Sequence, residues 1–485
     1  MIADPESLVL WGGDFGFKAS ISPAYRNELE VAVHNTGSDE SVLVGEIRVS
    51  GIATAVLAWE FGFLGGSVGV RTAAVVVAAV RQATQRGLPL VVLPRSGGTR
   101  MQEGAPAFVQ MVAIAAAVAA HRSAGLPYLV HLCSPTTGGV LATLGSAGDL
   151  TTAEPAAMVG FLGPRAYAAI TGEQFPDGVQ VAENLAARGI IDAVATWPQL
   201  RAHLAGVLGL WSERPGPGWV SPVQAPGGRA APAHVAGAPE SAEQLWEYVR
   251  VSRQRDRLDA EQFIAEHVTA FVELPGTGAG ERSGGALVGL GRMAGMPMVL
   301  AGTTDRRSGE PLTVGGLRTV RRGIDLAQRW GLPLVTVVDT LGAQLSVAGE
   351  ESGIAGEISR VMLDLVSART ATAALLLGAG TGGAALAMLA ADRIVAGSHT
   401  WVSPLPPEGA AAIRHGGSHD PAQVAWEQRI GAHALADLGF IDHVVRESHP
   451  GWMDVAAHEV VASLREALDG ADPGRRRERF DAWLT

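Results

Sequence analysis

Short stretches of this sequence recur at one fixed spacing, and this constrains the fold more than any other feature. Three pairs lie 244 residues apart: GLPLVVL at Gly87 with GLPLVTV at Gly331, VGEIRVSG at Val44 with VGLGRMAG at Val288, and Gly138-Gly139 with Gly382-Gly383. A fourth pair, GIIDAV near Ile191 and GFIDHV near Ile441, lies 250 residues apart. Unrelated apolar stretches would not keep one register over such a span. The sequence therefore predicts two tandem copies of one fold.

Each copy is expected to be an α/β unit with parallel strands that end in glycine pairs. The apolar runs Leu88–Leu93 and Tyr128–Cys133 are continuous rather than alternating, which favours buried parallel strands. They are followed by Gly97-Gly98 and Gly138-Gly139, and the second pair directly precedes a helical pattern over Val140–Ala147. Glycine lets a ligand approach the backbone, and a helix start offers unpaired N–H groups to an oxyanion.

The domain boundary follows from length and composition. With 485 residues the chain is longer than one ordinary domain. Ser212–Pro239 contains PGPG, APGG and GAPE with few large apolar residues, which is typical of a linker. We therefore expect a first domain over 1–211, a linker over 212–239 and a second domain over 240–485.

Charge and cysteine content narrow the classes of function and compartment. The formal net charge of −11 argues against nucleic acid as a partner. The single cysteine, Cys133, lies in an apolar run; we expect a core residue in a reducing, cytoplasmic compartment. The N-terminus has no basic, apolar leader pattern. Ala105–Ala120 is the most apolar segment but is shorter than a bilayer span, so it predicts a buried alanine-rich helix and no membrane partner.

Longer words in both halves resemble one enzyme family. EFGFLGGSVG (Glu60–Gly69), SGGTRMQEG (Ser96–Gly104), PTTGGVLATLGSAGD and VGFLGPR (Val159–Arg165) resemble the β subunit of bacterial acetyl-CoA carboxylase carboxyltransferase. VDTLGAQLSVAGEESG (Val338–Gly353), GTGGAALAMLAADRI and the run Pro406–Ile413 resemble its α subunit. The resemblance covers nearly the whole chain outside the linker. It implies two fused crotonase-like domains that move a carboxyl group from carboxybiotin to acetyl-CoA or another acyl-CoA, giving a malonyl-CoA-type product for fatty acid biosynthesis.

The resemblance also implies roles for individual residues. Gly138 and Gly139 would hold the thioester carbonyl of acyl-CoA, and Gly383 and Ala384 the carbonyl of biotin. Backbone N–H groups can stabilise both oxyanions, and biotin itself can take the substrate proton, so no Ser-His-Asp set is required. The expected CoA side comprises Gly65, Gly66, Ser96, Gly97, Gly98 and Arg100, with Arg100 either binding a CoA phosphate or anchoring its loop. The expected biotin side also includes Gly342, Ala343 and Gly382.

The departures from the family concern metal and biotin. A four-cysteine zinc ribbon is usual in these β subunits, but one cysteine cannot build it, so no zinc or other metal is expected. The loop that normally reads DTPGAYPG-like is Asp339–Ser346 here, without that Pro and Tyr, and the SPEG word is altered at Ser403–Gly409. Lys18 is the only lysine and no Met-Lys acceptor pair exists, so biotin must arrive on a separate carrier protein charged by a separate biotin carboxylase. A homodimer or larger even-numbered assembly is expected.

Alternative functions stay open at this point. A biotin-linked decarboxylase or another acyl-CoA enolate enzyme would use the same backbone sites. A non-catalytic, CoA-ester-binding scaffold would explain the altered biotin loops. Weaker patterns are G-x-G-x-x-G at Gly378–Gly383 for a dinucleotide and G-x-S-x-G at Gly65–Gly69 for a hydrolase. Glu350 and Glu351 fit helix capping better than proton transfer, and His415, His419 and Arg475–Arg479 fit solvated polar segments.

Overall fold

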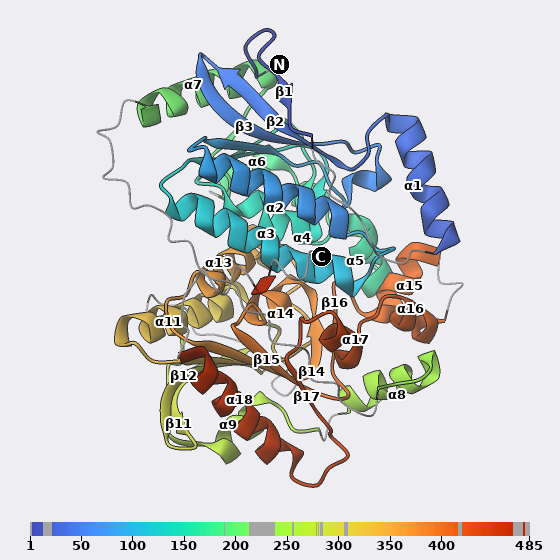
Figure 1. Cartoon of the computed structure of the whole chain (residues 1–485), viewed down its shortest axis with the longest axis vertical. Coiled ribbons are helices and arrows are strands. Elements are labelled where there is room, and N and C mark those ends of the chain that lie inside the picture. The colour runs from blue at the N-terminus through green and yellow to red at the C-terminus, as the bar shows by residue number, and fades with distance from the viewer. Residues whose placement is uncertain are drawn as a thin grey trace.

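The computed structural model of the chain (Figure 1) describes residues 2–12, 22–188, 190–212, 238–254, 257–277, 279, 281, 285–304, 309–415, 420–468 and 479–480. Most of the expected linker lies outside the described residues, as do Lys18, His419 and Arg475–Glu478.

The first half forms a seven-stranded sheet in the order β1-β2-β3-β4-β5-β7-β9. Its strands are β1 (Val9–Leu10), β2 (Val42–Val49), β3 (Ile52–Trp59), β4 (Leu90–Leu93), β5 (Tyr128–Leu132), β7 (Leu150–Ala153) and β9 (Ala193–Val194), with a separate pair β6 (Thr136–Thr137) and β8 (Val159–Gly160). Its helices are α1 (Pro23–Thr36), α2 (Val70–Gln85), α3 (Ala105–Ser123), α4 (Gly138–Thr143), α5 (Pro164–Thr171), α6 (Ala182–Ala187) and α7 (Trp197–Ser212), with short 3₁₀ turns η1 (Leu64–Gly66) and η2 (Gly145–Ala147).

The second half repeats this order as β10-β11-β12-β13-β14-β15-β17, with β16 paired to β14. Its strands are β10 (Val268–Glu273), β11 (Ala286–Met293), β12 (Met296–Thr303), β13 (Leu334–Thr340), β14 (Thr372–Thr381), β15 (Arg393–Gly397), β16 (Trp401–Ser403) and β17 (His443–Val445). Its helices are α8 (Ala242–Ser252), α9 (Ala260–His267), α11 (Val314–Trp330), α12 (Val347–Glu351), α13 (Ile354–Val366), α14 (Gly382–Met388), α15 (Pro407–His415), α16 (Pro421–Glu427), α17 (Ala432–Asp437) and α18 (Trp452–Leu468).

Matching turns show that the repeat is structural. The antiparallel hairpins β2–β3 and β11–β12 turn at Ser50-Gly51 and Ala294-Gly295, with φ of 50° and 82° in the first and 47° and 78° in the second. Two successive positive φ angles are what a tight hairpin with right-handed strand twist requires. The strands that follow each hairpin are parallel. The predicted class, an α/β chain of two tandem copies of one fold, is confirmed.

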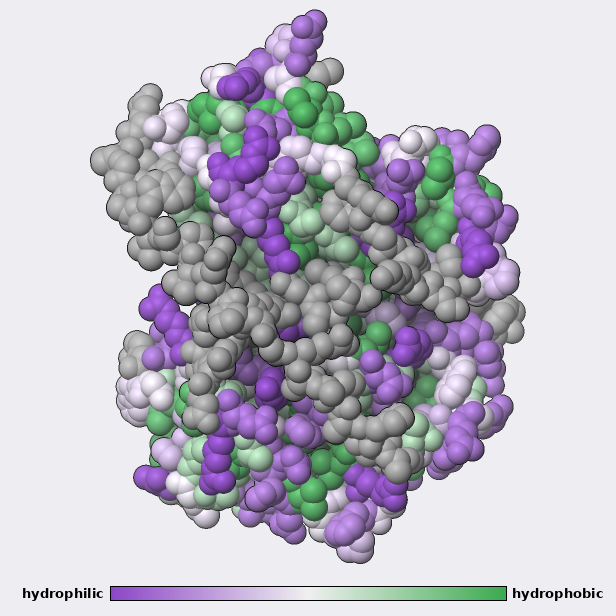
Figure 2. Space-filling model, viewed as in Figure 1, coloured by the Kyte–Doolittle hydropathy of each residue, from purple (hydrophilic) through white to green (hydrophobic). Residues whose placement is uncertain are grey.

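The two halves pack in layers with their helices between the sheets (Figure 1). One continuous apolar cluster joins residues of α2 and α3 to residues of α11, α13 and α14, so the halves share a core. The outer face of the first sheet is covered by α7, and the outer face of the second by α9 and α18. On the face in Figure 2, the described surface mixes hydrophilic residues with small groups of hydrophobic ones. The glycine pairs that open α4 and α14 therefore lie in the helical layer that the two halves share.

Helix α3 is long and apolar enough to cross a membrane by length and composition, and it alone meets that test among the described residues. It is a core element here, since 78% of its most apolar window is buried inside the structure. The predicted buried alanine-rich helix is thus confirmed, and it extends at its C-terminal end to Ser123 rather than Ala120.

Two smaller expectations change on inspection of the fold. The helix expected over Val140–Ala147 begins at Gly138 and is broken after Thr143, with η2 following. Arg479, expected in a solvated charge run, instead binds the Asp442 carboxylate and donates to the carbonyl oxygen of Phe440 at 2.8 Å. Cys133 is a buried free cysteine, as predicted.

Candidate active site

In the first half, one loop and one helix start meet at two glycines with left-handed backbone angles. Gly98, in the loop after β4, has φ 112°, and its N–H donates to Ser96 Oγ at 3.0 Å. Gly138, the first residue of α4, has φ 63°. A Cβ built on Gly98 would lie 3.6 Å from the Thr137 carbonyl oxygen. Glycine is needed at both positions because L side chains rarely adopt such φ values.

The second half repeats this geometry contact for contact. Gly342 has φ 122°, its N–H donates to Thr340 Oγ1 at 3.0 Å, and a Cβ there would lie 3.6 Å from the Thr381 carbonyl oxygen. Gly382 opens α14 with φ 76°. Gly98 thus corresponds to Gly342, and Gly138-Gly139 to Gly382-Gly383. This register pairs Ala384 with Val140, so the counterpart of Gly139 is Gly383.

The first turns of α4 and α14 offer backbone N–H groups that could bind an oxyanion. The Gly138 N–H donates to the Phe161 carbonyl oxygen at 3.1 Å. The N–H of Gly139, in the first turn of α4, has no carbonyl within its own helix to bind, and the same holds for Gly383 in α14. Such groups suit a developing oxyanion because they need no reorganisation as charge appears. A Cβ on Gly139 would lie 3.0 Å from Thr99 Oγ1, so the space beside this N–H is tightly limited.

Phe161 links the two glycine pairs within one chain. Its carbonyl oxygen binds the Gly138 N–H, and its ring lies 3.5 Å from where a Cβ on Gly383 would stand. That same Cβ position is 3.8 Å from the Cβ of Ala142, in α4. The first turn of α14 therefore packs against α4 in the shared helical layer.

Glu350 ties the halves together at this point, which the sequence did not reveal. Its carboxylate accepts N–H groups of Phe161 at 2.8 Å and Leu162 at 3.3 Å, and the Gln180 amide at 2.7 Å. Burial raises the pKa of Glu350 above its ordinary value, although these donors act in the opposite direction. The N-cap of α12 is Ser346, whose hydroxyl accepts the Gly349 N–H, so the expected capping role of Glu350 is wrong, although Glu350 does lie in the first turn of this helix, where a carboxylate suits the helix dipole.

The neighbouring carboxylate also reaches across the halves. Glu351 pairs with Arg188 at 2.6 Å and accepts the Asn184 amide at 3.5 Å. Phe161 lies in the VGFLGPR word, but no sequence pattern pointed to Gln180 or Asn184, because contacts between distant segments leave no local periodicity.

The expected CoA-side residues form one loop system beside Gly98. Gly66 has φ 63°, and a Cβ there would fall 2.0 Å from the Arg95 carbonyl oxygen, so only glycine fits. The Gly65 carbonyl oxygen accepts the Gly97 N–H at 3.0 Å. Ser96 is fully buried. Thr99 forms an isolated parallel β-bridge with Val68, and on the biotin side Ala343 forms the equivalent bridge with Leu312. Both loops are thus held by equivalent backbone bridges.

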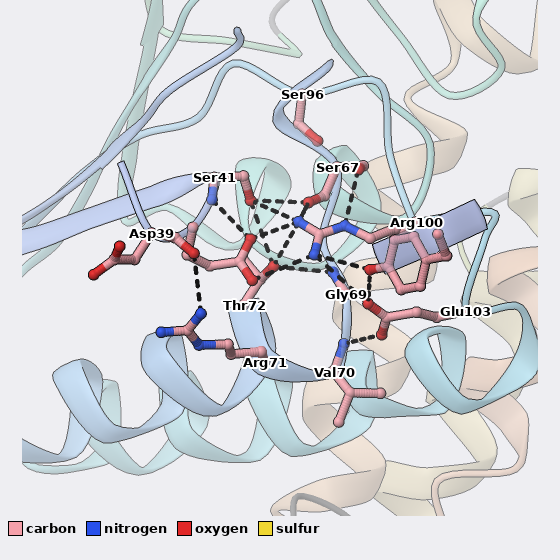
Figure 3. A network of polar contacts seen from close by, with 12 residues as sticks. Asp39, Ser41, Ser67, Gly69, Val70, Arg71, Thr72, Ser96, Arg100 and Glu103 are labelled. Atoms are coloured by element: carbon pink, nitrogen blue, oxygen red, sulfur yellow. Dashed lines mark hydrogen bonds and ion pairs between the residues drawn. The ribbon is translucent and has the colours of Figure 1, made fainter. Parts of the chain in front are cut away.

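Arg100 is the centre of a buried polar network (Figure 3). Its side chain is 1% exposed, and its guanidinium binds Glu40 Oε1 at 2.5 Å and the Ser67 carbonyl oxygen at 2.8 Å. Burial would raise the pKa of Glu40, but Arg100 beside it holds that pKa below the usual range. Glu103 joins the network through Tyr25 and the Val70 N–H. Of the two roles considered for Arg100, the geometry favours loop anchoring, since no face of the guanidinium is open to a phosphate.

The competing motifs do not fit their required geometry. Ser67 of the G-x-S-x-G pattern accepts the Arg100 Nε–H at 3.2 Å, which uses it as a structural hydroxyl in the loop. Gly378 and Gly380 lie within strand β14 rather than in a turn after it. A Cβ on Gly378 would lie 2.2 Å from Asp339 Oδ1, so this glycine serves close packing.

A cavity of about 310 Å³ lies between the halves, beside these elements. It is lined on one side by η2, β7 and Arg188, and on the other by Glu350, Glu351 and α13. The glycine pairs do not line it. The cavity therefore belongs to the contact between the halves rather than to the helix starts.

Known proteins place the chain in a family. A family model described as "Carboxyl transferase domain" matches residues 23–427. The probable biotin-dependent acyl-coenzyme A carboxylase beta3 subunit of Mycobacterium tuberculosis (strain ATCC 25618 / H37Rv) is 44% identical over 466 residues, covering 96% of this chain and 90% of that protein. Acetyl-coenzyme A carboxylase carboxyl transferase subunits beta/alpha of Salinispora arenicola (strain CNS-205) is 36% identical over 458 residues, covering 92% and 80%.

Two solved structures are similar at lower identity. A transcarboxylase 12S structure is 18% identical, covers 97% of this chain and 88% of that one, and gives a TM-score of 0.40. The β subunit of P. aeruginosa geranyl-CoA carboxylase is 17% identical, covers 97% and 85%, and gives a TM-score of 0.36.

The two tandem units, each with a glycine loop set against a helix start, define an α/β protein built from two copies of one fold. The chain belongs to the carboxyl transferase family, because the family model spans most of its length. It is a carboxyltransferase of the kind found in biotin-dependent acyl-CoA carboxylases.

Proposed function

We propose that this chain moves a carboxyl group from carboxybiotin, borne on a separate carrier protein, to acetyl-CoA or a longer acyl-CoA, giving a malonyl-CoA-type product. The observation that carries the proposal is the equivalence of Gly98 and Gly138-Gly139 with Gly342 and Gly382-Gly383. Two anion-binding backbone sites are what this reaction needs, since one oxyanion develops on the thioester and another on biotin.

The division of labour follows the repeat. The first half, with Gly65, Gly66 and Ser96–Gly98, would bind the acyl-CoA and hold its thioester carbonyl at Gly139. The second half, with Gly342, Ala343 and Gly382, would hold the biotin carbonyl at Gly383, with Ala384 next to it. Biotin when bound supplies the carboxyl group; the residues of this chain orient it, exclude water and stabilise charge. The residues present fit this role because the same backbone geometry occurs in both halves.

The partners follow from the single lysine, Lys18, which has no acceptor motif around it. We propose separate biotin carboxyl carrier and biotin carboxylase chains, a cytoplasmic location suited to a free buried thiol, and a homodimer or larger even-numbered assembly. Light scattering under assay conditions tests the assembly, and a fully active monomer would contradict it.

A second candidate function rests on the loop Asp339–Ser346. Leu341 in this loop is 52% exposed beside Gly342, a hydrophobic residue at the position where biotin should enter. A scaffold that binds CoA esters without carboxyl transfer would tolerate such a change. A decarboxylase would need only the first-half site that stabilises the enolate.

One experiment separates these functions. The purified chain is mixed with free carboxybiotin and with acetyl-, propionyl- or longer acyl-CoA, and carboxylated CoA ester is measured over time. Transfer to at least one ester supports the proposal, and the series gives the acyl preference. Binding of the ester without transfer supports the scaffold, whereas loss of carboxyl from the product ester alone supports the decarboxylase.

A further inference from the structure

Three side chains with metal-binding atoms meet where β5 and β7 end. The strands pair in parallel, with His131 opposite Thr152. Cys133 and Glu154 each lie one residue beyond the end of their strand. One ligand atom from each of His131, Cys133 and Glu154 lies within 4.8 Å of the others, and no other group of this kind occurs among the described residues. His131 and Cys133 are buried, whereas the Glu154 side chain is 19% exposed and gives access from the surface.

A matched residue in the same half shows how both ring nitrogens of a fully buried histidine can find partners. His121 is also fully buried, and both of its ring nitrogens have partners: Thr84 Oγ1 at 3.0 Å and the Pro127 carbonyl oxygen at 3.2 Å. His131 Nδ1 likewise contacts a threonine hydroxyl, Thr152 Oγ1, at 2.8 Å. Its Nε2, however, is buried with no hydrogen-bond partner. A buried polar atom without a partner costs free energy, which a bound ion would offset.

Glu154 retains coordinating capacity despite its protein contacts. The Ser134 N–H at 2.9 Å and Arg95 Nη2 at 3.8 Å both approach Oε2. The Cys133 sulfur makes a weak contact, at 3.8 Å, with the His131 carbonyl oxygen and a side-chain hydrogen bond with Glu154. The three groups offer one nitrogen, one sulfur and one oxygen, a donor set that suits zinc better than magnesium or calcium.

We propose that His131, Cys133 and Glu154 bind one divalent ion of the zinc class, with a fourth position left for water. The thiol loses its proton to solvent on binding, because the thiolate is the ligand. This site is independent of the zinc ribbon that the cysteine count excludes, and it does not depend on the proposed carboxyl transfer. Sequence reasoning missed it because Glu154 is 21 residues from Cys133 and joins it only through strand pairing.

The position of the site suggests what the ion would do. Cys133 and Ser134 begin the segment that leads into Gly138-Gly139, and Thr136 Oγ1 donates to the Cys133 carbonyl oxygen at 2.7 Å. An ion at this point would fix the end of β5 and so the start of the segment that presents the Gly139 N–H. The expected effect is stabilisation rather than a direct part in chemistry.

Zinc titration of the full chain, without a histidine tag and stripped with a chelator, tests the proposal. Elemental analysis after gel filtration should give one zinc per chain, and Co²⁺ should give a thiolate charge-transfer band. The melting temperature should rise with zinc concentration. Cys133→Ser and His131→Gln should each weaken zinc binding by at least about 100-fold, since even outer-shell changes cost about 10- to 100-fold.

His121→Gln is the matched control and should keep one zinc per chain. Cys133→Ser replaces one atom and is expected to fold even if His131→Gln does not. Folded wild-type chain that binds no stoichiometric zinc would overturn the proposal. So would a Cys133→Ser chain that binds zinc as tightly as wild type, because the thiolate would then not be a ligand.

Discussion

The Glu350 carboxylate accepts the backbone N–H of Phe161 at 2.8 Å, although 189 residues separate them in the chain. The carbonyl oxygen of the same Phe161 accepts the Gly138 N–H, and its ring packs beside Gly383. Glu350 is therefore a positioning residue: it comes from the second half and fixes a residue that contacts both helix starts. The two proposed oxyanion sites are coupled through one buried carboxylate.

Removal of this carboxylate should destabilise the contact between the halves. In Glu350→Ala the N–H groups of Phe161 and Leu162 and the Gln180 amide lose their acceptor, and we expect a loss of about 3 kcal/mol in free energy of unfolding. Denaturant titration measures it. Glu351→Ala is the control, because its partner Arg188 is 46% exposed and the pair should contribute less than about 1 kcal/mol. Equal effects of the two changes would contradict the bridging role of Glu350.

The raised pKa of Glu350 predicts a dependence of stability on pH. At pH values just above 4.5, the ordinary pKa of Glu350, the folded chain keeps a proton on this carboxyl that the unfolded chain has lost. Stability that comes from Glu350 is therefore present at low pH and declines as pH rises through the folded pKa. The free energy of unfolding of wild type minus that of Glu350→Gln should fall as pH rises above 4.5 and through the raised pKa of the folded chain. A difference that stays constant would show that burial does not perturb this group.

Loss of the Arg100 side chain should lower the stability of the fold more than it weakens the binding of acyl-CoA. In Arg100→Gln the buried Glu40 loses its ion pair, and breaking such a pair costs about 3 to 5 kcal/mol. Arg71→Gln is the control, because Arg71 in the same region is half-buried and donates to the Asp39 carbonyl oxygen, at 3.1 Å, in an exposed contact. A large rise in KM for acyl-CoA with no drop in melting temperature would instead place Arg100 against a CoA phosphate.

The sequence was informative where the fold depends on local pattern. The repeat of Gly138-Gly139 at Gly382-Gly383 located both helix starts, and continuous apolar runs located β4 and β5. It could not show that Arg100 is enclosed by Glu40 and Ser67, since these lie 60 and 33 residues away in the chain. The 244-residue offset had already aligned Gly383 with Gly139, although Ala384 was expected to share the biotin carbonyl. The positive φ of Gly382, like that of Gly138, agrees with this register.

Gly139→Pro tests the acyl-CoA site. Proline removes the N–H and, at the second helical position, is compatible with a helix start, so the chain should fold. Loss of one oxyanion donor should lower the transfer rate by about 100- to 1000-fold. Gly139→Ala keeps the N–H and should cost less than about tenfold, although its Cβ would lie 3.0 Å from Thr99 Oγ1. A folded proline variant with a rate within about threefold of wild type would refute this site.

Gly383→Pro tests the biotin site, whose loop departs most from the family pattern. If the repeat has a function in both halves, the Gly383 N–H stabilises charge on biotin as the Gly139 N–H does on the thioester. We expect carboxyl transfer from free carboxybiotin to fall at least about tenfold, which is about 1.4 kcal/mol of transition-state stabilisation. Acyl-CoA affinity, measured by calorimetry, should change less than about threefold, because that ester binds in the first half.

Gly383→Ala is the control: its Cβ would lie 3.3 Å from Ile358 Cγ2, a contact that a small shift relieves, and it keeps the N–H. Ala384→Pro, one residue along, removes the next N–H of α14 and should also lower transfer if both donors face biotin. A folded Gly383→Pro chain with undiminished transfer would show that the second half does not hold biotin at α14, and the scaffold function would then be favoured.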